Sequence, residues 1–186
     1  MENINWGKIE TVSTNYAQPP AGGYILAICA VEDYPSKKYN KIYYDIAGAA
    51  DKANEEFVGY YGQRKERSGG KIQLPFFIRS YKESARGYYK AFLVALEKSK
   101  NRGFIADSYN NDEQQFVGMV IGAVLGEEAY EWQGKKGIRL YVKDVYSIAR
   151  IQKGDFKIPA LKAAKNSTPA APAAPIYQVR ENEVPF

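Results

Sequence analysis

Residues 115–148 read QFVGMVIGAVLGEEAYEWQGKKGIRLYVKDVYSI, and this stretch predicts a long β-hairpin. Apolar and polar residues alternate along the returning arm, which is the pattern of a half-buried strand. The apolar positions are Ile138, Leu140, Val142 and Val145, set against Arg139, Tyr141, Lys143 and Asp144. The segment Gly134 to Gly137 predicts the turn, because glycine tolerates positive φ and the two lysines between the glycines stay solvated.

The charge and the aromatic rings of this hairpin predict its ligand. Seven basic and two acidic residues lie between Lys135 and Lys157, so their balance of +5 equals the formal net charge of the whole chain. Tyr130 and Trp132 stand just before the turn. A β-ribbon that combines aromatic rings with concentrated positive charge is suited to a polyanion whose bases can stack.

Length and composition indicate one domain with an added tail. The chain has 186 residues, of which 45% are hydrophobic and 25% charged, enough for one ordinary core. No apolar run approaches the roughly 18 residues of a membrane span, and the first 15 residues lack the pattern of a signal peptide. We therefore expect a cytoplasmic protein with no membrane partner.

Catalysis and cofactors are not expected. The chain has no histidine, which removes the commonest general base and metal ligand. Its single cysteine, Cys29, lies in the apolar run YILAICAV and is predicted to be a small core residue. The sequence therefore predicts no enzyme, no catalytic residue, no metal site and no cofactor.

Three strands are predicted ahead of the hairpin, at residues 24–32, 41–47 and 57–61. In the second strand Ile42, Tyr44 and Ile46 face one way, and the residues between them face the other. The connection at residues 33–40 is basic and interleaved with aromatic residues, and the charged segment 63–71 is predicted to be a loop.

One helix is predicted between the third strand and the hairpin. Ser80 is a suitable N-cap, and Glu83 three residues later completes a capping box. The helix ends near Lys100, and its apolar face consists of Ala85, Tyr88, Tyr89, Phe92 and Leu96. Three strands, a helix and a hairpin follow the order of a mainly β, five-stranded OB-fold barrel whose helix closes one end.

The predicted domain occupies residues 21–158, after an N-terminal leader at residues 1–20. Residues 159–180 form a linker rich in alanine and proline, a composition that cannot supply a core and predicts disorder. The final residues 181–186 read ENEVPF and combine two acids with an apolar end. We expect this C-terminal tip to bind partner proteins through Glu181, Glu183, Val184, Pro185 and Phe186.

Two resemblances agree with this organisation. The tip is similar to that of bacterial single-stranded DNA-binding proteins, in which an OB domain, a flexible linker and an acidic tail end in a hydrophobic residue, Pro and Phe. The body, over residues 21–161, resembles a family of phage replication and recombination proteins from Gram-positive hosts, many of them labelled only as domains of unknown function. The matching segments are PAGGY at 20–24, FIRSYKE at 77–83, VLGEEAYE at 124–131 and KGDFKIP at 153–159.

These resemblances imply binding of single-stranded DNA during phage replication, recombination or repair, without catalysis, in the host cytoplasm. They also imply recruitment through the tip of a recombinase, helicase, primase, polymerase or nuclease. A homodimer or higher homo-oligomer is an alternative to a monomer.

The candidate DNA-binding residues are aromatic or basic, because rings stack on bases and cations contact phosphates. The aromatic candidates are Tyr34, Tyr39, Tyr43, Tyr60, Tyr61, Tyr130, Trp132 and Tyr141. The basic candidates are Lys37, Lys38, Lys41, Arg64, Lys65, Arg79, Lys135, Lys136, Arg139 and Lys143.

Two other functions are compatible with the chain. A basic barrel could serve assembly as a virion or scaffold protein. A metal-dependent nuclease could use Asp144, Asp155 and Lys157, although the carboxylates lack the supporting cluster such a site requires.

Overall fold

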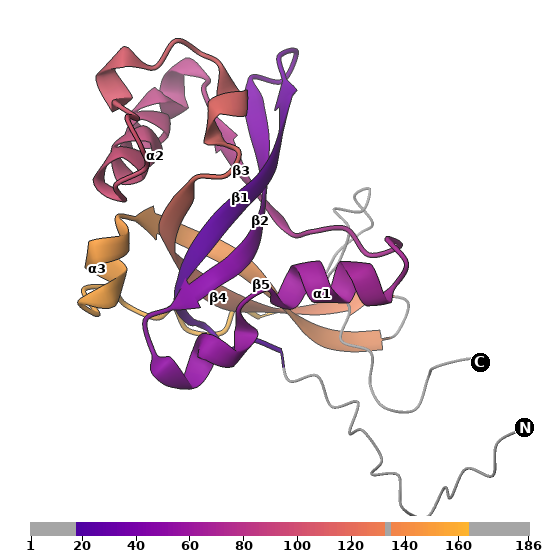
Figure 1. Cartoon of the computed structure of the whole chain (residues 1–186). Helices are drawn as coiled ribbons and strands as arrows, with labels where there is room; N and C mark the ends of the chain where they lie inside the picture. The colour runs from indigo at the N-terminus through magenta and orange to yellow at the C-terminus, as the bar shows by residue number, and fades with distance from the viewer. Residues whose placement is uncertain (1–17, 133–134, 164–186) are drawn as a thin grey trace, which may run out of the picture.

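The computed structural model describes residues 18–132 and 135–163 of the protein. Five antiparallel strands form one sheet in the order β3-β2-β1-β4-β5, which curls into a nearly closed barrel (Figure 1). The strands are β1 (Gly22–Tyr34), β2 (Tyr39–Ala49), β3 (Phe76–Ser80), β4 (Val120–Trp132) and β5 (Lys135–Tyr146). The α-helices are α1 (Tyr60–Arg67), α2 (Arg86–Lys98) and α3 (Ile148–Gln152). Short 3-10 helices are η2 (Lys52–Phe57), η3 (Glu83–Ala85), η4 (Ala106–Ser108) and η5 (Glu113–Phe116).

Helix α2 lies between β3 and β4 in the chain and supplies much of the core. Its buried residues are Tyr89, Phe92, Leu93, Ala95 and Leu96. The Phe92 ring lies 6.1 Å from the ring of Phe77 on β3 and 5.3 Å from that of Phe116 in η5, centroid to centroid. The predicted fold, a mainly β OB barrel of five strands with a helix between the third and fourth, is confirmed.

The predicted alternation of β2 is confirmed. Ile42, Tyr44 and Ile46 are buried inside the barrel, and the residues between them lie on the outer surface. The connection from β1 to β2 is shorter than predicted, because the strands continue to Tyr34 and Tyr39 and leave only residues 35–38 as the turn.

The prediction of a third strand at residues 57–61 is wrong, and the predicted loop at 63–71 is helical up to Arg67. Phe57 ends η2, and α1 covers residues 60–67. The helix begins where it does because the Asp45 carboxylate on β2 accepts hydrogen bonds from the backbone N–H groups of Tyr61 and Gly62, at 3.0 Å and 2.9 Å. This carboxylate satisfies two N–H groups that a helix leaves unpaired at its start.

The third strand is formed instead by residues 76–80, which pair with β2. Ser80 therefore ends a strand and does not cap α2, and the predicted capping box is absent from this helix. The Ser80 Oγ donates to the Lys38 carbonyl across the sheet. Ala85 occupies the N-cap position of α2. Of the two tyrosines predicted to pack in the core, Tyr89 does so, but Tyr88 is 80% exposed.

The hairpin of β4 and β5 is confirmed, but its turn is shorter than predicted. Lys135 already pairs with Trp132, so the connection consists of residues 133–134, which lie outside the described part of the chain. The register shifts so that Lys143 is an extra residue on β5. This bulge lets Val142 and Val145, three residues apart, both pack against the core.

The prediction that Cys29 is a core residue is wrong, because its side chain is exposed. Ile28 pairs with Tyr44 and Ala30 pairs with Tyr43, so Cys29 is the extra residue of a second bulge, in β1. Tyr24, Leu26 and Ile28 are buried, so alternation along β1 already directs Cys29 outward, and the bulge shifts the phase so that Val31 is the next buried residue.

The described chain continues to pair with the barrel after residue 158, where the linker was predicted to begin. The backbone N–H of Lys162 donates to the Glu127 carbonyl, and the N–H of Ala129 donates to the Lys162 carbonyl, both at 2.9 Å. The leader up to residue 17 and the chain from residue 164 onward, with the predicted disordered linker and tip, lie outside the described residues.

Gly122 on β4 permits the close approach of α3, and its replacement by alanine is expected to destabilise the fold. A Cβ atom there would lie 2.6 Å from the Ile151 side chain and 2.8 Å from the Ser147 carbonyl oxygen. We expect Gly122→Ala to lower the free energy of unfolding by about 1–3 kcal/mol, measured by urea titration. Gly87→Ala is the matched control, because a Cβ at this helical position meets nothing within 4 Å. Equal stability of the two variants would contradict the prediction.

Candidate nucleic-acid interface

An outer surface of the barrel carries a row of four aromatic residues and one lysine that we call the aromatic strip. It consists of Tyr34, Tyr39, Lys41, Tyr43 and Phe76. The three β2 residues are at alternate positions and therefore share one face. Tyr34 on β1 pairs with Tyr39, and Phe76 on β3 pairs with Tyr43. The sheet register thus collects side chains from three strands into one half-buried surface.

The members of the aromatic strip contact one another directly. The rings of Tyr34 and Tyr39 are stacked, with centroids 4.9 Å apart and planes 22° apart. Tyr43 and Phe76 form a second pair at 5.4 Å. The Lys41 ammonium lies between the pairs, 4.8 Å from the Tyr34 centroid and 4.9 Å from that of Phe76. A cation held near two aromatic rings leaves a surface that suits both bases and phosphates.

Hydrogen bonds fix the strip. Lys41 donates to the Tyr34 hydroxyl at 3.2 Å, and this bond raises the pKa of Lys41. The hydroxyls of Tyr34 and Tyr43 both donate to Oε2 of Glu32, at 2.8 Å and 3.0 Å. Partial burial and the bond to Glu32 raise the pKa of Tyr43 to about 12, so its proton is retained at neutral pH.

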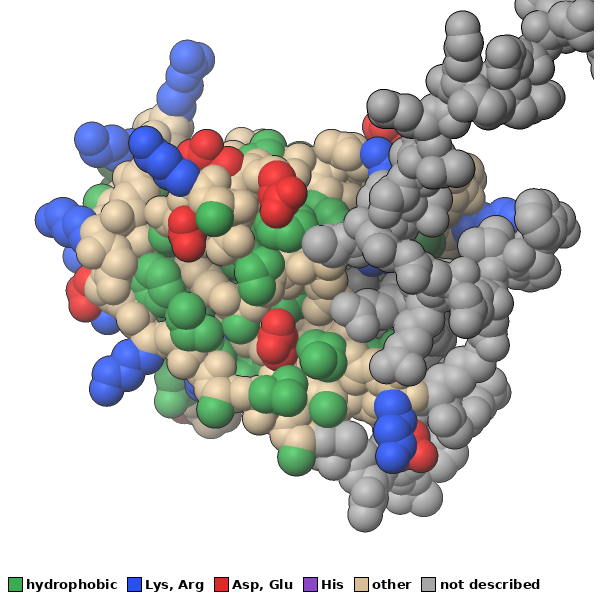
Figure 2. Space-filling model, turned by 90° about the horizontal axis from the view of Figure 1, so that it is seen from below, with side chains coloured by type: hydrophobic (Ala, Val, Ile, Leu, Met, Phe, Trp, Pro, Cys, Tyr) green, Lys and Arg blue, Asp and Glu red, His purple; other side chains and the backbone are tan. Residues whose placement is uncertain are grey.

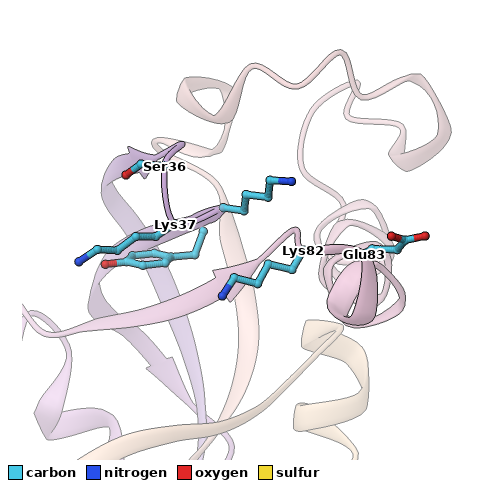
Figure 3. Close-up of a pocket in the computed structure, with 6 residues that line it drawn as sticks. Ser36, Lys37, Lys82 and Glu83 are labelled. Carbon is cyan, nitrogen blue, oxygen red and sulfur yellow. The ribbon is translucent and has the colours of Figure 1, made fainter.

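A basic pocket adjoins one end of the strip. This lysine pocket is lined by Ser36, Lys37, Lys38, Tyr39, Lys82 and Glu83 and has a volume of about 560 Å³. Ser36 and Lys37 come from the β1–β2 turn, whereas Lys82 follows β3, and Glu83 extends in the opposite direction from Lys82 (Figure 3). Tyr39 belongs to both the pocket and the strip. The ring at the end of the stack therefore lines one pocket together with three exposed lysines.

Helix α1 adds further positive charge near the other end of the strip. Asp45, which follows Tyr43 on the same face of β2, holds the start of α1, and the last turn of this helix contains Arg64, Lys65 and Arg67. The Arg64 guanidinium lies 5.5 Å from the Tyr60 ring and donates to its hydroxyl at 3.2 Å. Tyr60 is thus a helical residue beside the basic cluster and not part of the third strand.

Two candidate DNA-binding residues point toward the core of the barrel. Tyr61 is only 4% exposed and packs edge-on against Tyr44 in the core. The Arg79 guanidinium lies 4.8 Å from the Phe77 ring and 5.8 Å from the Phe92 ring, and burial lowers its pKa to about 10. Arg79 alternates with the exposed Ile78, so β3 directs its half-buried side chain toward the core and away from the face that carries the aromatic strip.

The β4–β5 hairpin is less basic than its returning arm suggests. Arg139 pairs with Glu128 across the strands at 2.9 Å, and Lys136 lies 3.9 Å from Glu131. Residues 120–146 contain four basic and four acidic residues, so the net charge of the hairpin is zero. The predicted excess of charge came from counting residues 135–157, a range that leaves out the acidic residues of β4 and continues past the end of β5.

The remaining candidates on this hairpin are separated from the aromatic strip. Tyr141 contacts the ammonium of Lys162, 3.6 Å from the ring centroid, and Lys143 is exposed at the bulge. Tyr130 is half-buried near the end of β4. The side chains of Trp132 and Lys135 lie outside the described part of the structure.

The lower end of the barrel, opposite the β1–β2 turn, has a different character. Figure 2 shows hydrophobic and acidic side chains in the middle of this face, with lysine and arginine side chains projecting from its margins. A polyanion is repelled by acidic side chains, and therefore this end is a poorer candidate than the lysine pocket.

The prediction from sequence missed three residues of this surface. Phe76 and the exposed Ile78 were overlooked because β3 was placed elsewhere, although the apolar segment after Pro75 was a detectable strand signal. Lys82 falls within the predicted helix, whereas the pairing of β3 with β2 places it beside the β1–β2 turn.

No family model matches the chain, and a search of curated proteins finds none similar to it. Among the described residues, no helix is long and apolar enough to cross a membrane. Within residues 18–132 and 135–163, no three acidic or cysteine side chains lie close enough together to hold a metal ion. Asp155, one of the carboxylates considered for a nuclease, is paired with Arg150 at 3.2 Å.

Proposed function

We propose that the protein binds single-stranded DNA along the aromatic strip and the lysine pocket, without catalysing a reaction. The observation that carries this proposal is the position of Tyr39, which ends a stack of two rings and also lines a pocket with three lysines. A base stacked on Tyr39 would continue the existing stack, and its phosphates would lie within reach of Lys37, Lys38 and Lys82. This combination of a ring and a cationic rim suits any base sequence.

The same arrangement favours a single strand over a duplex. Stacking requires an unpaired base with an accessible face, which a double helix does not offer. The cationic rim predicts binding that weakens with salt, as counterions return to the phosphates.

The biological setting is part of the proposal and rests on the sequence resemblances. In this setting the protein coats single-stranded DNA during phage replication, recombination or repair in the host cytoplasm. Residues 181–186 would recruit a recombinase, helicase, primase, polymerase or nuclease. The recruiting role of the tip is supported by sequence alone, because these residues lie outside the described structure.

The direct test is Tyr39→Ala, which should weaken binding of a single-stranded homopolymer by about 1–3 kcal/mol, because one stacking surface is lost. Fluorescence anisotropy with a labelled oligonucleotide measures the change, and parallel titrations with duplex DNA and RNA define the ligand. Tyr88→Ala is the matched control, since this ring is 80% exposed on α2. Wild-type protein that binds duplex as well as single strand, or equal effects of the two substitutions, would refute the proposal.

A further inference from the structure

Glu32 is an acidic residue at the centre of the surface assigned to a polyanion. It lies on β1 directly opposite Lys41 and on the outer side of the sheet. Its Oε2 atom accepts the hydroxyl hydrogens of both Tyr34 and Tyr43. A carboxylate here opposes the binding of phosphates by like-charge repulsion, so its presence calls for a physical reason.

The hydrogen bonds supply that reason. A phenol has one proton to donate, and both Tyr34 and Tyr43 donate theirs to the same carboxylate oxygen. The Tyr34 hydroxyl also accepts from Lys41, which lies near the rings of Tyr34 and Phe76. Glu32 therefore connects the two aromatic pairs of the strip and holds the positions of two phenol groups directly and of one cation through Tyr34.

We propose that Glu32 is a positioning residue that holds the aromatic strip in the conformation that receives unpaired bases. This inference rests on the proposed function and adds the residue that prepares the surface. Side chains that are already ordered lose less conformational entropy on binding, which increases affinity. The negative charge also keeps phosphates away from the rings, so that bases face the strip and the phosphate backbone follows the lysines.

The test compares two substitutions that both remove the negative charge of Glu32. They differ in whether an oxygen remains to accept the hydrogen bonds of the two phenols. Glu32→Ala removes a negative charge, yet we expect it to weaken single-strand affinity about threefold to tenfold, because two rings are released. Glu32→Gln keeps an oxygen that accepts from the phenols, and should bind within about twofold of the wild type or more tightly. Glu66→Ala is the charge-matched control on the exposed side of α1, where loss of the acid should leave affinity equal or increase it.

Measurements on the free protein separate this inference from the proposed function. Carbon-13 NMR of labelled tyrosines should show shifted Tyr34 and Tyr43 ring signals in Glu32→Ala and little change in Glu66→Ala, while the melting temperatures remain similar. If the wild type does not bind single-stranded DNA, the proposed function fails, and the ring signals still decide whether Glu32 orders the strip. If Glu32→Ala binds single strands as well as the wild type or better, or leaves the ring signals unchanged, the positioning role is wrong.

Discussion

Replacing Lys37, Lys38 and Lys82 together by glutamine should make single-strand binding markedly less dependent on salt. Each lost phosphate contact on a single strand lowers the slope of log affinity against log salt by about 0.7, so three contacts lower it by about 2. The ratio of wild-type to variant affinity should therefore fall about 20-fold between 50 and 200 mM salt. Titrations by fluorescence anisotropy at several salt concentrations measure both quantities.

The matched control for this triple variant removes three positive charges elsewhere. Lys52, Lys98 and Lys153 are exposed and take no part in the lysine pocket. Their replacement by glutamine changes the net charge equally, but should leave most of the salt slope intact, because exposed charges beyond about 10 Å are largely screened at 0.1 M salt. Equal losses in the two triple variants would show that net charge, and not the pocket, determines binding.

Phe92→Ala should produce the largest loss of stability, about 3–5 kcal/mol in the free energy of unfolding. The ring is fully buried and contacts Phe77, Tyr89 and Phe116, which belong to β3, α2 and η5. Its removal leaves a cavity where the helix meets the barrel. Urea denaturation followed by circular dichroism measures the effect, and the midpoint should fall while the slope of the transition remains unchanged.

A graded variant checks the physical reason for this loss. Phe92→Leu keeps most of the apolar volume and should cost clearly less than Phe92→Ala, because the cost depends on the size of the cavity left behind. A loss below about 1 kcal/mol in Phe92→Ala would place α2 outside the cooperative core and contradict the observed packing.

The parts of the fold that were predicted are those determined by local pattern. The alternation of Ile42, Tyr44 and Ile46 identified β2 and its buried face, and the apolar arms on either side of residues 133–134 identified the hairpin. Helix α1 was missed because Asp45, which holds its start, is 16 residues before Tyr61. No local capping signal marks that helix, and an aromatic segment next to it has the composition of a strand.

The candidate site was predicted in part for the same reason. Tyr34, Tyr39 and Tyr43 lie close together in the sequence, on the two arms of one hairpin, so sequence alone could group them. The contribution of Phe76 and Lys82 depends on the register of β3, which no spacing reveals. The β4–β5 hairpin was overvalued because its neutralising acids are on the opposite strand, where pairing brings Glu128 to Arg139.

The exposed Cys29, at the bulge in β1, has a consequence for the redox chemistry of the protein. As the chain has one cysteine, any disulfide between two copies must join Cys29 to Cys29. Such a bond would bring the outer surfaces of two β1 strands together. Partial burial of the sulfur, with the nearby Asp45 carboxylate, raises the pKa of the thiol and so keeps it in its less reactive form at neutral pH. Air oxidation should therefore be slow, and a thiol-specific dye should attach at one known position.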